Sequence, residues 1–411
     1  MKLLVKLAYR NLWRNRRRTL LTISAMAVAT TLLILTLGIY DGMLWDMVDG
    51  ATKVYHGHVK ITADQYLERR QLHLTIPENG MYEKIRTDSE VQGIAGRVRA
   101  FALLSFGEDE SGHTQPSELF GIDPAEERNV TTLHEHVSEG RFLNGSDSHE
   151  IILGNGLAKL LEAKIGGEVV AMGQASDGSI AADIFQVTGI IDTGDPVRDA
   201  SLAVVGRKTL QRMFVLEGKL HELSITLKHS PDAKKWASKL QPEFQGMEVT
   251  SWNTFLPQIG QIMEAWGAMK FIFAAIFYFA VILVAANTMY MALLERMREF
   301  GIMTAIGFKR RRLTRMIILE GSLMSGIAGI AGGLAGMIGS FYLKNHVIDL
   351  SAFITQISYA EATLQPRLRS YPTLDNILGP TVMIILLGMI VAIFPARKLR
   401  RFRPIDVLRE V

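Results

Sequence analysis

Four long stretches of this chain lack Asp, Glu, Lys and Arg, and they constrain the fold more than any other feature. They contain 22, 24, 23 and 21 residues and cover residues 19–40, 271–294, 321–343 and 376–396. An α-helix needs roughly 20 apolar residues to cross the hydrocarbon core of a bilayer. The sequence therefore predicts four transmembrane helices, with a long polar segment between the first two.

Basic residues are concentrated beside these stretches. Residues 1–18 carry seven Lys or Arg, residues 295–315 carry seven and residues 397–411 carry six, against four acidic residues in the three segments together. Residues 41–270 hold 22 basic and 33 acidic side chains, a net charge of −11. Because Lys and Arg in short loops stay on the cytoplasmic side, both termini and the 295–315 loop are predicted to be cytoplasmic. The net charge of +4 hides this asymmetry and does not indicate nucleic-acid binding.

The segment between the first two spans has a mixed pattern. Alternating or β-rich runs predict strands at 58–62, 98–106, 119–122, 150–153, 168–172, 185–191, 202–205 and 223–227, and helical spacing predicts helices at 156–164, 207–214 and 232–240. Gly- and acid-containing segments near 107–116 and 173–183 predict loops. Because strands and helices interleave without regular βαβ spacing, we predict an α-helical membrane domain of four transmembrane helices plus an α+β extracytoplasmic domain inserted between the first and second spans.

Two segments beside the outer domain keep helical spacing beyond the predicted spans. Apolar residues recur through 42–55, after the first span, and through 252–269, before the second. Two rigid extensions would form stalks that transmit movement; the alternative is two ordinary packing helices of the outer domain. Residues 2–18 favour a basic amphipathic helix at the inner membrane surface, with Trp13 at the level of the headgroups.

These patterns divide the chain into nine segments. In order they are an amphipathic cytoplasmic helix (1–18), the first span (19–41), the extracytoplasmic α+β domain with its stalks (42–269), the second span (270–294), a cytoplasmic loop (295–315), the third span (316–343), a short outer loop (344–375), the fourth span (376–396) and a cytoplasmic tail (397–411). The first apolar stretch is longer than the core of a signal peptide, which has about 7–15 residues, and is interpreted as an uncleaved anchor.

The third span is rich in glycine and contains one acidic residue near its cytoplasmic end. Two G-x-x-x-G spacings are formed by Gly329, Gly332, Gly333 and Gly336. Because small residues let helices approach closely in lipid, these glycines are predicted to lie in a helix–helix contact, within the chain or between two copies. The acidic residue is Glu320. It is either a functional group, since an unpaired carboxylate in a membrane is costly, or the partner of Arg315 or an N-terminal arginine.

Common catalytic motifs are missing from the sequence. It contains no G-x-x-x-x-G-K-[ST], so it should not bind ATP through a P-loop, and no H-E-x-x-H or G-x-S-x-G. The chain has no cysteine, which excludes disulfides and thiol chemistry. The pairs His56-x-His58 and His134-x-His136 lack further ligands and are interpreted as surface or strand histidines. We therefore expect no enzyme activity, no metal and no cofactor.

Three of the predicted cytoplasmic segments carry a resemblance to a known family. Residues 8–19 read AYRNLWRNRRRT, residues 295–307 read ERMREFGIMTAIG and residues 395–409 read PARKLRRFRPIDVLR. Together they resemble the permease subunits of the FtsX/MacB/LolCDE group of ABC transporters, with the patterns E-R-x-x-E-[IF]-G-x-x-x-A-[IL]-G and P-A…P-[IV]-x-x-L-[RK]. That family has four spans and a large extracytoplasmic domain between the first two.

The resemblance implies that residues 295–307 form a coupling helix that docks on a separate ATPase subunit. The residues it assigns to this role are Glu295, Arg296, Arg298, Glu299, Phe300, Gly301, Ala305 and Gly307. The local chemistry agrees, because charged residues form one face and an apolar face holds Phe300, Ile302, Met303 and Ile306. A glycine at 307 suits the helix end, where a left-handed residue is common. The alternative is a loop that only sets the topology.

Two stretches of the outer domain narrow the resemblance. Residues 119–127 (LFGIDPAEE) and 150–159 (EIILGNGLAK) resemble the corresponding parts of the LolC and LolE lipoprotein-release permeases. The resemblance implies a non-catalytic permease of the bacterial inner membrane, with a periplasmic domain moved by mechanotransmission. Implied partners are an ABC ATPase dimer, a second permease copy, identical or paralogous, membrane lipid and a periplasmic lipoprotein carrier.

Three alternatives remain open at this stage. A MacB-like efflux permease and an FtsX-like regulatory permease that activates an extracytoplasmic enzyme share the same cytoplasmic motifs. A membrane-anchored binding domain without an ATPase is the third. Because MacB-like permeases usually carry a fused nucleotide-binding domain and this sequence contains none, the ATPase is expected on a different chain.

Overall fold

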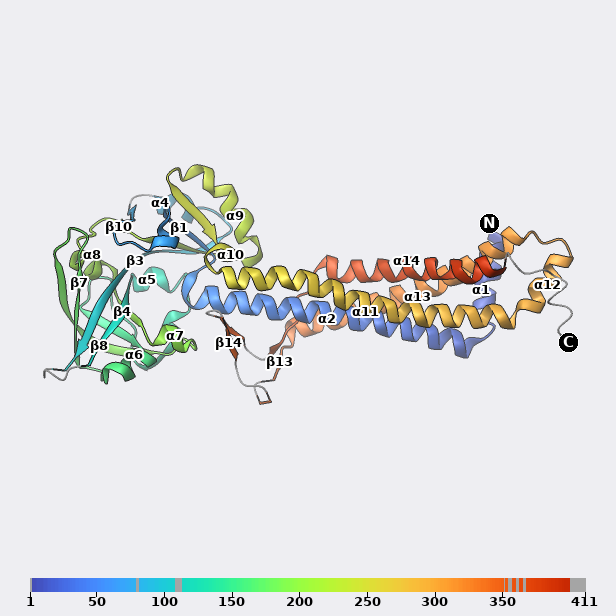
Figure 1. The fold of residues 1–411 in the computed structure, drawn as a ribbon, viewed down its shortest axis with the longest axis horizontal. Coiled ribbons are helices and arrows are strands. Elements are labelled where there is room, and N and C mark those ends of the chain that lie inside the picture. Colours follow the sequence, from blue (N-terminus) through green and yellow to red (C-terminus); the bar gives the residue numbers. More distant parts are fainter. Residues whose placement is uncertain are drawn as a thin grey trace. The chain divides into compact units, whose positions relative to one another are not determined.

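The computed structural model describes residues 2–78, 81–107, 113–350, 352–353, 357–359, 362–364 and 367–399. The chain forms two compact units, and Figure 1 labels many of their elements. The helical unit comprises Met1–Leu44, Glu264–Phe353 and Pro366–Val411, and the sheet unit comprises Trp45–Met263 and Ile354–Gln365. Most of the predicted cytoplasmic tail, from residue 400 onward, and residues 108–112 of a predicted loop lie outside the described residues.

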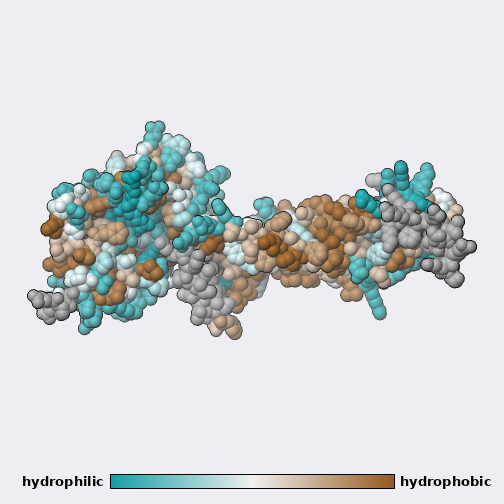
Figure 2. Space-filling view, in the orientation of Figure 1, coloured by the Kyte–Doolittle hydropathy of each residue, from teal (hydrophilic) through white to brown (hydrophobic). Residues whose placement is uncertain are grey.

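Within the described residues, four helices are long and apolar enough to cross a membrane. They are α2 (Arg16–Ala51), α11 (Pro257–Glu295), α13 (Arg310–Asn345) and α14 (Leu374–Leu399), and they contain the four predicted spans. Exposed apolar side chains such as Phe271, Ile276 and Phe279 follow α11, and Figure 2 shows hydrophobic colour along the long helices. A helix that is apolar on its exposed face suits lipid. α2 continues into a π-helix, η1 (Thr52–His56).

Two helices joined by a turn replace the single helix that was predicted for residues 2–18. α1 (Lys2–Leu12) ends before the turn at residues 13–15, and α2 starts at Arg16. The hydroxyl of Thr19 donates to the carbonyl oxygen of Leu12 at 2.7 Å, which satisfies an acceptor at the end of α1. The prediction missed the break because residues 13–15, WRN, contain no Gly or Pro that would mark it.

In the sheet unit, ten strands of the described residues form one mixed sheet. They are β1 (Val59–Ala63), β3 (Val91–Phe106), β4 (His113–Ile122), β5 (Val137–Gly140), β6 (Glu150–Gly154), β7 (Glu168–Gln174), β8 (Ile180–Ile191), β9 (Leu202–Gly206), β11 (Glu222–Leu227) and β12 (Met247–Ser251). The order is β12-β1-β11-β3-β4-β9-β6-β8-β5, with β7 paired to both β3 and β8. The pairs β4–β9 and β6–β8 are parallel. Because β7 joins β3 to β8, the strands β3, β4, β9, β6, β8 and β7 form a closed circuit.

Short elements complete the fold. The helices are α3 (Tyr66–Arg69), α4 (Met81–Arg86), α5 (Pro124–Glu127), α6 (Asn155–Leu161), α7 (Pro196–Asp199), α8 (Arg207–Met213), α9 (Ala233–Leu240), α10 (Trp252–Phe255) and α12 (Met297–Ala305), with 3₁₀ turns η2 (Leu133–His136), η3 (Ser230–Asp232) and η4 (Gln241–Glu243). Two-stranded pairs are β2 (Ile76–Pro77) with β10 (Lys219–Leu220), β13 (Ile348–Asp349) with β16 (Arg367–Leu368) and β14 (Ile357–Tyr359) with β15 (Ala362–Leu364).

Most local predictions for the sheet unit are confirmed. All eight predicted strands and all three predicted helices are present, with ends that differ by up to seven residues. The predicted loops at 107–116 and 173–183 are wrong in part, because β4 begins at His113, β7 reaches Gln174 and β8 begins at Ile180. The strands β5 and β12 were missed because their sequences, VSEG and MEVTS, are short and largely polar.

The interpretation of the first histidine pair as surface or strand residues is wrong for His56, and His58 lies one residue before the strand in which it was predicted. His56 and His58 have exposed fractions of 6% and 0%. His56 lies in η1, and His58 lies just before β1, where its Nδ1 accepts a hydrogen bond from the N–H of Leu227 at 3.0 Å. Burial leaves Nε2 of His58 without a hydrogen-bond partner among the described residues, which is a cost that the hydrogen bond at Nδ1 offsets in part.

Candidate functional site

Residues 295–307, called the elbow below, turn the chain sharply after α11. α11 ends at Glu295, and Arg296, with φ −108° and ψ 11°, lies outside both helices. α12 then runs to Ala305, and Gly307 follows with φ +96°. The left-handed glycine at the helix end agrees with the prediction. The elbow is therefore a short helix set off from α11 by a break at one residue.

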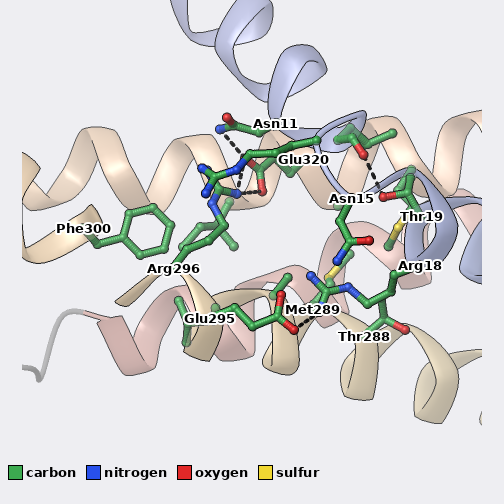
Figure 3. Close-up of a pocket in the computed structure, with 17 residues that line it drawn as sticks. Asn11, Asn15, Arg18, Thr19, Thr288, Met289, Glu295, Arg296, Phe300 and Glu320 are labelled. Carbon is green, nitrogen blue, oxygen red and sulfur yellow. Dashed lines mark hydrogen bonds and ion pairs between the residues drawn. The ribbon is translucent and has the colours of Figure 1, made fainter. Parts of the chain in front are cut away.

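Two arginines from the N-terminal segment hold the acidic residues of the elbow. The guanidinium of Arg14 donates to both carboxylate oxygens of Glu299, at 2.8 Å for the Nη1 contact. Arg18 of α2 donates to Glu295 at 2.7 Å (Figure 3). The hydrogen bond from Arg14 holds the pKa of Glu299 below its usual value. Both pairs are partly exposed, so each adds only about 0.2–1 kcal/mol to stability.

Glu320 of α13 is the third anchor of the elbow. Nη1 of Arg296 lies 3.0 Å from both of its carboxylate oxygens, and Nδ2 of Asn11 donates to it at 2.7 Å (Figure 3). The expected partners, Arg315 or an N-terminal arginine, are wrong. The break after α11 brings Arg296 to α13, and that long-range contact has no local signature. α1, the elbow and α13 thus converge on one carboxylate.

The predicted apolar face of the elbow divides into a buried and an exposed part. Phe300 has an exposed fraction of 3%, and Gly301 is also buried. Phe300 packs in a cluster with Leu293, Leu313, Met316, Ile317 and Ala396. Ile302 and Ile306 are 49% and 77% exposed. A single apolar face is therefore the wrong description, because only the side toward α13 and α14 is covered.

Four residues of the elbow form an exposed ridge, called the elbow ridge below. They are Arg298, Ile302, Ala305 and Ile306. Their spacing of four, three and one places them along one side of a helix. The ridge is apolar over most of its length and basic at one end. Exposed side chains of this kind suit contact with another protein.

A cavity of about 280 Å³ lies between the elbow, the turn after α1, α11 and α13 (Figure 3). Asn11, Arg18 and Glu320 supply polar groups to its wall, and Met289 and Met324 supply apolar surface. The roles of Asn11, Arg14 and Arg18 were not predicted from the sequence. One signal was available, because the Arg14–Arg18 spacing of four equals the Glu295–Glu299 spacing.

The four glycines of the G-x-x-x-G spacings lie in contacts within the chain. A Cβ added to Gly332 would lie 2.5 Å from the carbonyl oxygen of Ala27 in α2, and one added to Gly336 would lie 2.9 Å from Cβ of Ile34. Toward α14, a Cβ on Gly329 would lie 2.7 Å from Ile385 and one on Gly333 would lie 2.6 Å from Thr381. Glycine therefore lets α13 approach two helices at once.

An ionic contact also joins three helices at the ends of the spans away from the elbow. Asp41 of α2 pairs with Lys270 of α11 and accepts a hydrogen bond from Asn376 of α14 at 2.6 Å. The sequence reading did not single out these residues, because each lies at the edge of an apolar run. The described residues contain no group of three His, Cys, Asp or Glu side chains placed to hold a metal ion.

Comparison with known proteins covers both units. Residues 19–242 match the family described as MacB-like periplasmic core domain, and residues 271–404 match FtsX-like permease C-terminal. The lipoprotein-releasing system transmembrane protein LolC of Neisseria meningitidis is 23% identical over 408 residues, which cover 95% of this chain and 94% of that protein. The uncharacterized ABC transporter permease MJ1507 of Methanocaldococcus jannaschii is 24% identical over 66% of this chain and 65% of its own length.

A solved structure is also similar in part. The periplasmic region of MacB from Actinobacillus actinomycetemcomitans aligns with 54% of this chain and 97% of its own, at 14% identity and a TM-score of 0.38. The family assignment comes from the sequence matches, of which the first alone spans residues 19–242. The chain belongs to the ABC transporter permeases of the FtsX/MacB/LolC family.

Proposed function

We propose that this chain is the membrane subunit of an ABC transporter that releases lipoproteins from the bacterial inner membrane. ATP hydrolysis by a separate ATPase chain moves the elbow, and the helices pass the movement to the sheet unit. The observation that carries the proposal is the similarity to LolC, which extends over 95% of the chain and therefore includes both units. Extraction of acyl chains costs about 0.8 kcal/mol per CH₂, which explains a need for ATP.

The elbow ridge is the proposed contact with the ATPase. Ile302 and Ile306 present apolar surface at the end of the long helices, and Arg298 adds a charge that can pair with a carboxylate. The buried side chain of Phe300 packs against α13 and α14 and thereby holds the ridge in place. The partner is an ATPase dimer, and two permease copies, identical or paralogous, complete the transporter.

Three features support transmission of movement from the elbow. Arg296 and Glu320 tie the elbow to α13 at 3.0 Å. Glycine contacts fix α13 against α2 and α14 at close range. Asp41 and Lys270 then tie α2 to α11, the two helices whose residues 45–51 and 257–263 belong to the sheet unit. A push on the elbow therefore reaches both helical connections to the sheet unit.

The charge pattern supports the proposed membrane topology. Arg14, Arg18 and the basic residues around α12 lie at one end of the spans, where the positive-inside rule puts the cytoplasm. Both chain ends are then cytoplasmic, and the sheet unit, between the first and second spans in the chain, is periplasmic. The helical extensions of α2 and α11 act as its stalks.

An exposed apolar face on the sheet unit favours lipoprotein release over a purely regulatory role. Phe101 and Leu103 of β3, Val170 and Met172 of β7 and Ile184 of β8 are 36–62% exposed. Leu103 pairs with Met172 and Val170 pairs with Ile184, so these side chains adjoin on one face of three strands. Exposed apolar patches mark interaction sites. This face suits a partner with apolar surface, such as a lipoprotein carrier.

Docking is tested by substitutions on the elbow ridge. Ile302→Asp and Ile306→Asp should abolish copurification of the ATPase while the purified chain stays folded. The matched control is Leu160→Asp on α6, which changes a side chain that is 47% exposed in the sheet unit. Copurification that survives both ridge variants would contradict the proposed contact.

Cargo is tested by depletion of the chain in cells. Retention of lipoproteins in the inner membrane supports the release function. Normal sorting with increased drug sensitivity indicates a MacB-like efflux permease. Normal sorting with defective wall hydrolysis indicates an FtsX-like regulatory permease. Each outcome leaves the family assignment intact and decides only what the movement accomplishes.

A further inference from the structure

A pocket of about 640 Å³ in the sheet unit gathers four cationic side chains. They are Lys60 of β1, Arg70 after α3, Arg99 of β3 and Arg198 of α7. Lys60 and Arg99 are almost completely buried, with 4% and 7% exposed fractions. Cations this deep need acceptors, because an uncompensated buried charge is costly. The positions of the available acceptors decide what the pocket can bind.

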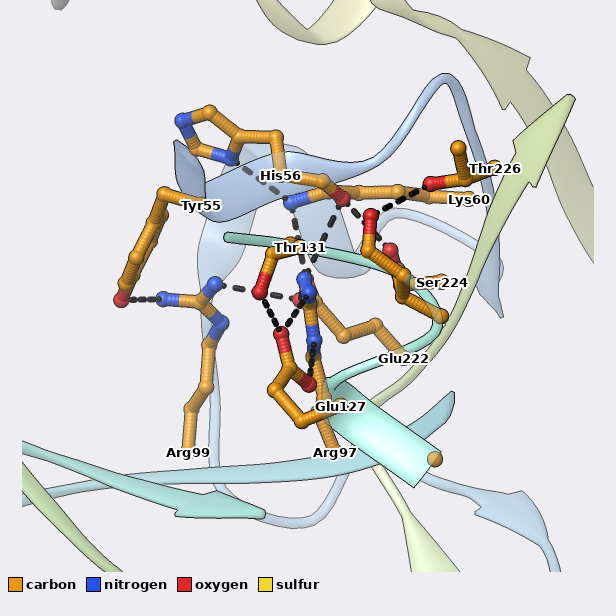
Figure 4. A network of polar contacts seen from close by, with 12 residues as sticks. Tyr55, His56, Lys60, Arg97, Arg99, Glu127, Thr131, Glu222, Ser224 and Thr226 are labelled. Carbon is orange, nitrogen blue, oxygen red and sulfur yellow. Dashed lines mark hydrogen bonds and ion pairs between the residues drawn. The ribbon is translucent and has the colours of Figure 1, made fainter. Parts of the chain in front are cut away.

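Carboxylates of the protein satisfy the inner part of this cluster (Figure 4). Arg97, behind the pocket, donates to Glu127 from Nη2 at 2.6 Å and from Nε at 3.0 Å. Glu222 accepts from Lys60, Arg97 and Arg99 at 3.0–3.1 Å. One carboxylate therefore serves three cations.

Two acidic residues on the pocket wall are already occupied. Glu118 accepts from Arg99 at 2.5 Å. Asp195 caps α7, where its Oδ1 accepts from the N–H groups of Val197 and Arg198 at 3.1 and 3.4 Å. Its other oxygen, Oδ2, lies 3.9 Å from Nε of Arg198. The carboxylates on this wall are thus committed to local donors.

His56 lies between two cationic donors of the cluster. Its Nε2 lies 3.2 Å from Nη2 of Arg198, and its Nδ1 lies 3.2 Å from Nζ of Lys60. Neither a guanidinium nor an ammonium group can accept a hydrogen bond, and a neutral imidazole has only one acceptor nitrogen. The ring of His56 therefore accepts from Arg198 or from Lys60, but not from both.

The surroundings of Lys60 disfavour its charged form. Burial lowers its pKa to about 7, against the opposing attraction of Glu222. The groups that face it are His56 of η1, Glu222 of β11, Arg97 and Arg99 of β3 and the ring of Phe255 in α10, whose centroid lies 4.8 Å from Nζ. Three of these five carry or can carry positive charge. An added acceptor on the pocket side would let the amine remain protonated.

We propose that this pocket binds a phosphate-type oxyanion, which accepts hydrogen bonds from Arg198 and Lys60. Guanidinium and ammonium groups are the usual partners of phosphate oxygens. Tyr55 forms part of the wall, with its ring 3.9 Å from the guanidinium carbon of Arg198. Tyr55 and His56 come from the π-helix η1, an uncommon element that is frequent at functional sites.

The ligand is a phosphate group, either free or in the headgroup of an anionic phospholipid. The pocket measures about 640 Å³, and its lining includes Leu67 and Val197 beside the charged groups, so it can admit a group larger than phosphate itself. Both connections to the long helices contribute to it, through η1 after α2 and Gln258 of α11. The inference does not depend on the proposed release function.

Calorimetric titration of the full chain in a zwitterionic detergent tests the proposal. Inorganic phosphate is one probe, soluble dihexanoyl phosphatidylglycerol is the second, and chloride at equal ionic strength is the control. Arg198→Gln should weaken binding roughly tenfold or more, since it removes a charge-assisted hydrogen bond. Arg212→Gln, an exposed arginine paired with Asp147 outside the pocket, should bind like the unmodified chain.

Proton uptake supplies a readout that a structural role would not change. Above neutral pH, binding should take up close to one proton, about the amount needed to charge Lys60. Titrations in two buffers of different ionisation enthalpy measure it, and Lys60→Gln should abolish it. Saturable binding of phosphate alone identifies a free oxyanion, and binding of the phospholipid alone identifies a headgroup. Absence of both, or equal affinity in Arg198→Gln, overturns the proposal whatever the cargo assays show.

Discussion

The close approach of α13 to α2 predicts the effect of adding a single methyl group at Gly332. A Cβ at Gly332 would lie 2.5 Å from the carbonyl oxygen of Ala27, 2.7 Å from Cβ of Thr30 and 3.0 Å from Cα of Ala27. Two of these three atoms belong to the backbone of α2, which cannot rotate away. The hydroxyl of Thr31 also donates to the carbonyl oxygen of Gly332 at 3.1 Å. Gly332→Ala must therefore push the two helices apart.

The same helix supplies a matched control. At Gly326 an added Cβ meets no atom within 4 Å. Replacement of glycine by alanine in a helix is worth about 0.5–1 kcal/mol in favour of the helix, and this gain applies to both sites. Overpacking at Gly332 costs about 1–3 kcal/mol. Since the propensity gain cancels, Gly332→Ala should be less stable than Gly326→Ala by about 1–3 kcal/mol.

Reversible unfolding of the full chain in mixed detergent micelles measures this difference. Helix loss is followed by circular dichroism, and tryptophan fluorescence serves as a second probe of the same transition. Gly326→Ala should equal or exceed the unmodified chain in stability. Equal stability of the two alanine variants would refute the close contact of α13 with α2, because the same chemical change would then meet the same surroundings.

Three further predictions follow from particular contacts. Arg14→Glu or Glu299→Arg alone should reduce ATPase stimulation in the assembled transporter, and the double variant should restore it; failure of the double variant to do so would exclude the pair as the cause. Burial lowers the pKa of His58 and His221 to about 4, below the value of about 6.5 in an unfolded chain. Their stabilisation is therefore complete above pH about 6.5 and is lost as the pH falls toward about 4; urea unfolding midpoints that stay level over this range would contradict it. Met172→Ser on the exposed sheet face should leave the free energy of unfolding unchanged within about 0.5 kcal/mol but weaken carrier crosslinking.

Local patterns were sufficient to predict the spans and most strands. Uncharged runs specify membrane helices because every residue in the run contributes to the same transfer free energy. The strand at β7 shows alternation in its own sequence, with Val169 and Ala171 buried and Val170 and Met172 exposed. Prediction failed for β12, which is short and largely polar. It also failed at the turn after Leu12, which no local pattern marks.

The polar interior of the sheet unit could not be predicted from spacing. Arg97 and Glu222 are 125 positions apart in the chain and meet at 3.0 Å. The local sequence around each of these two residues shows only alternation, and an exposed charged residue of a strand would have the same surroundings in sequence. Burial of such groups depends on several partners that arrive from different strands, and a pattern within one strand does not contain them.

The elbow shows why a matching motif does not by itself identify a docking surface. Glu295 and Glu299, the two most distinctive letters of the pattern, are held by arginines of the same chain, and Arg296 is held by Glu320. Substitution of these residues therefore tests whether the elbow stays attached to the spans. Ile302 and Ile306 take no part in these ion pairs and are 49% and 77% exposed. Loss of ATPase contact on substitution of the isoleucines, with the ion pairs intact, would separate recognition of the partner from transmission of its movement.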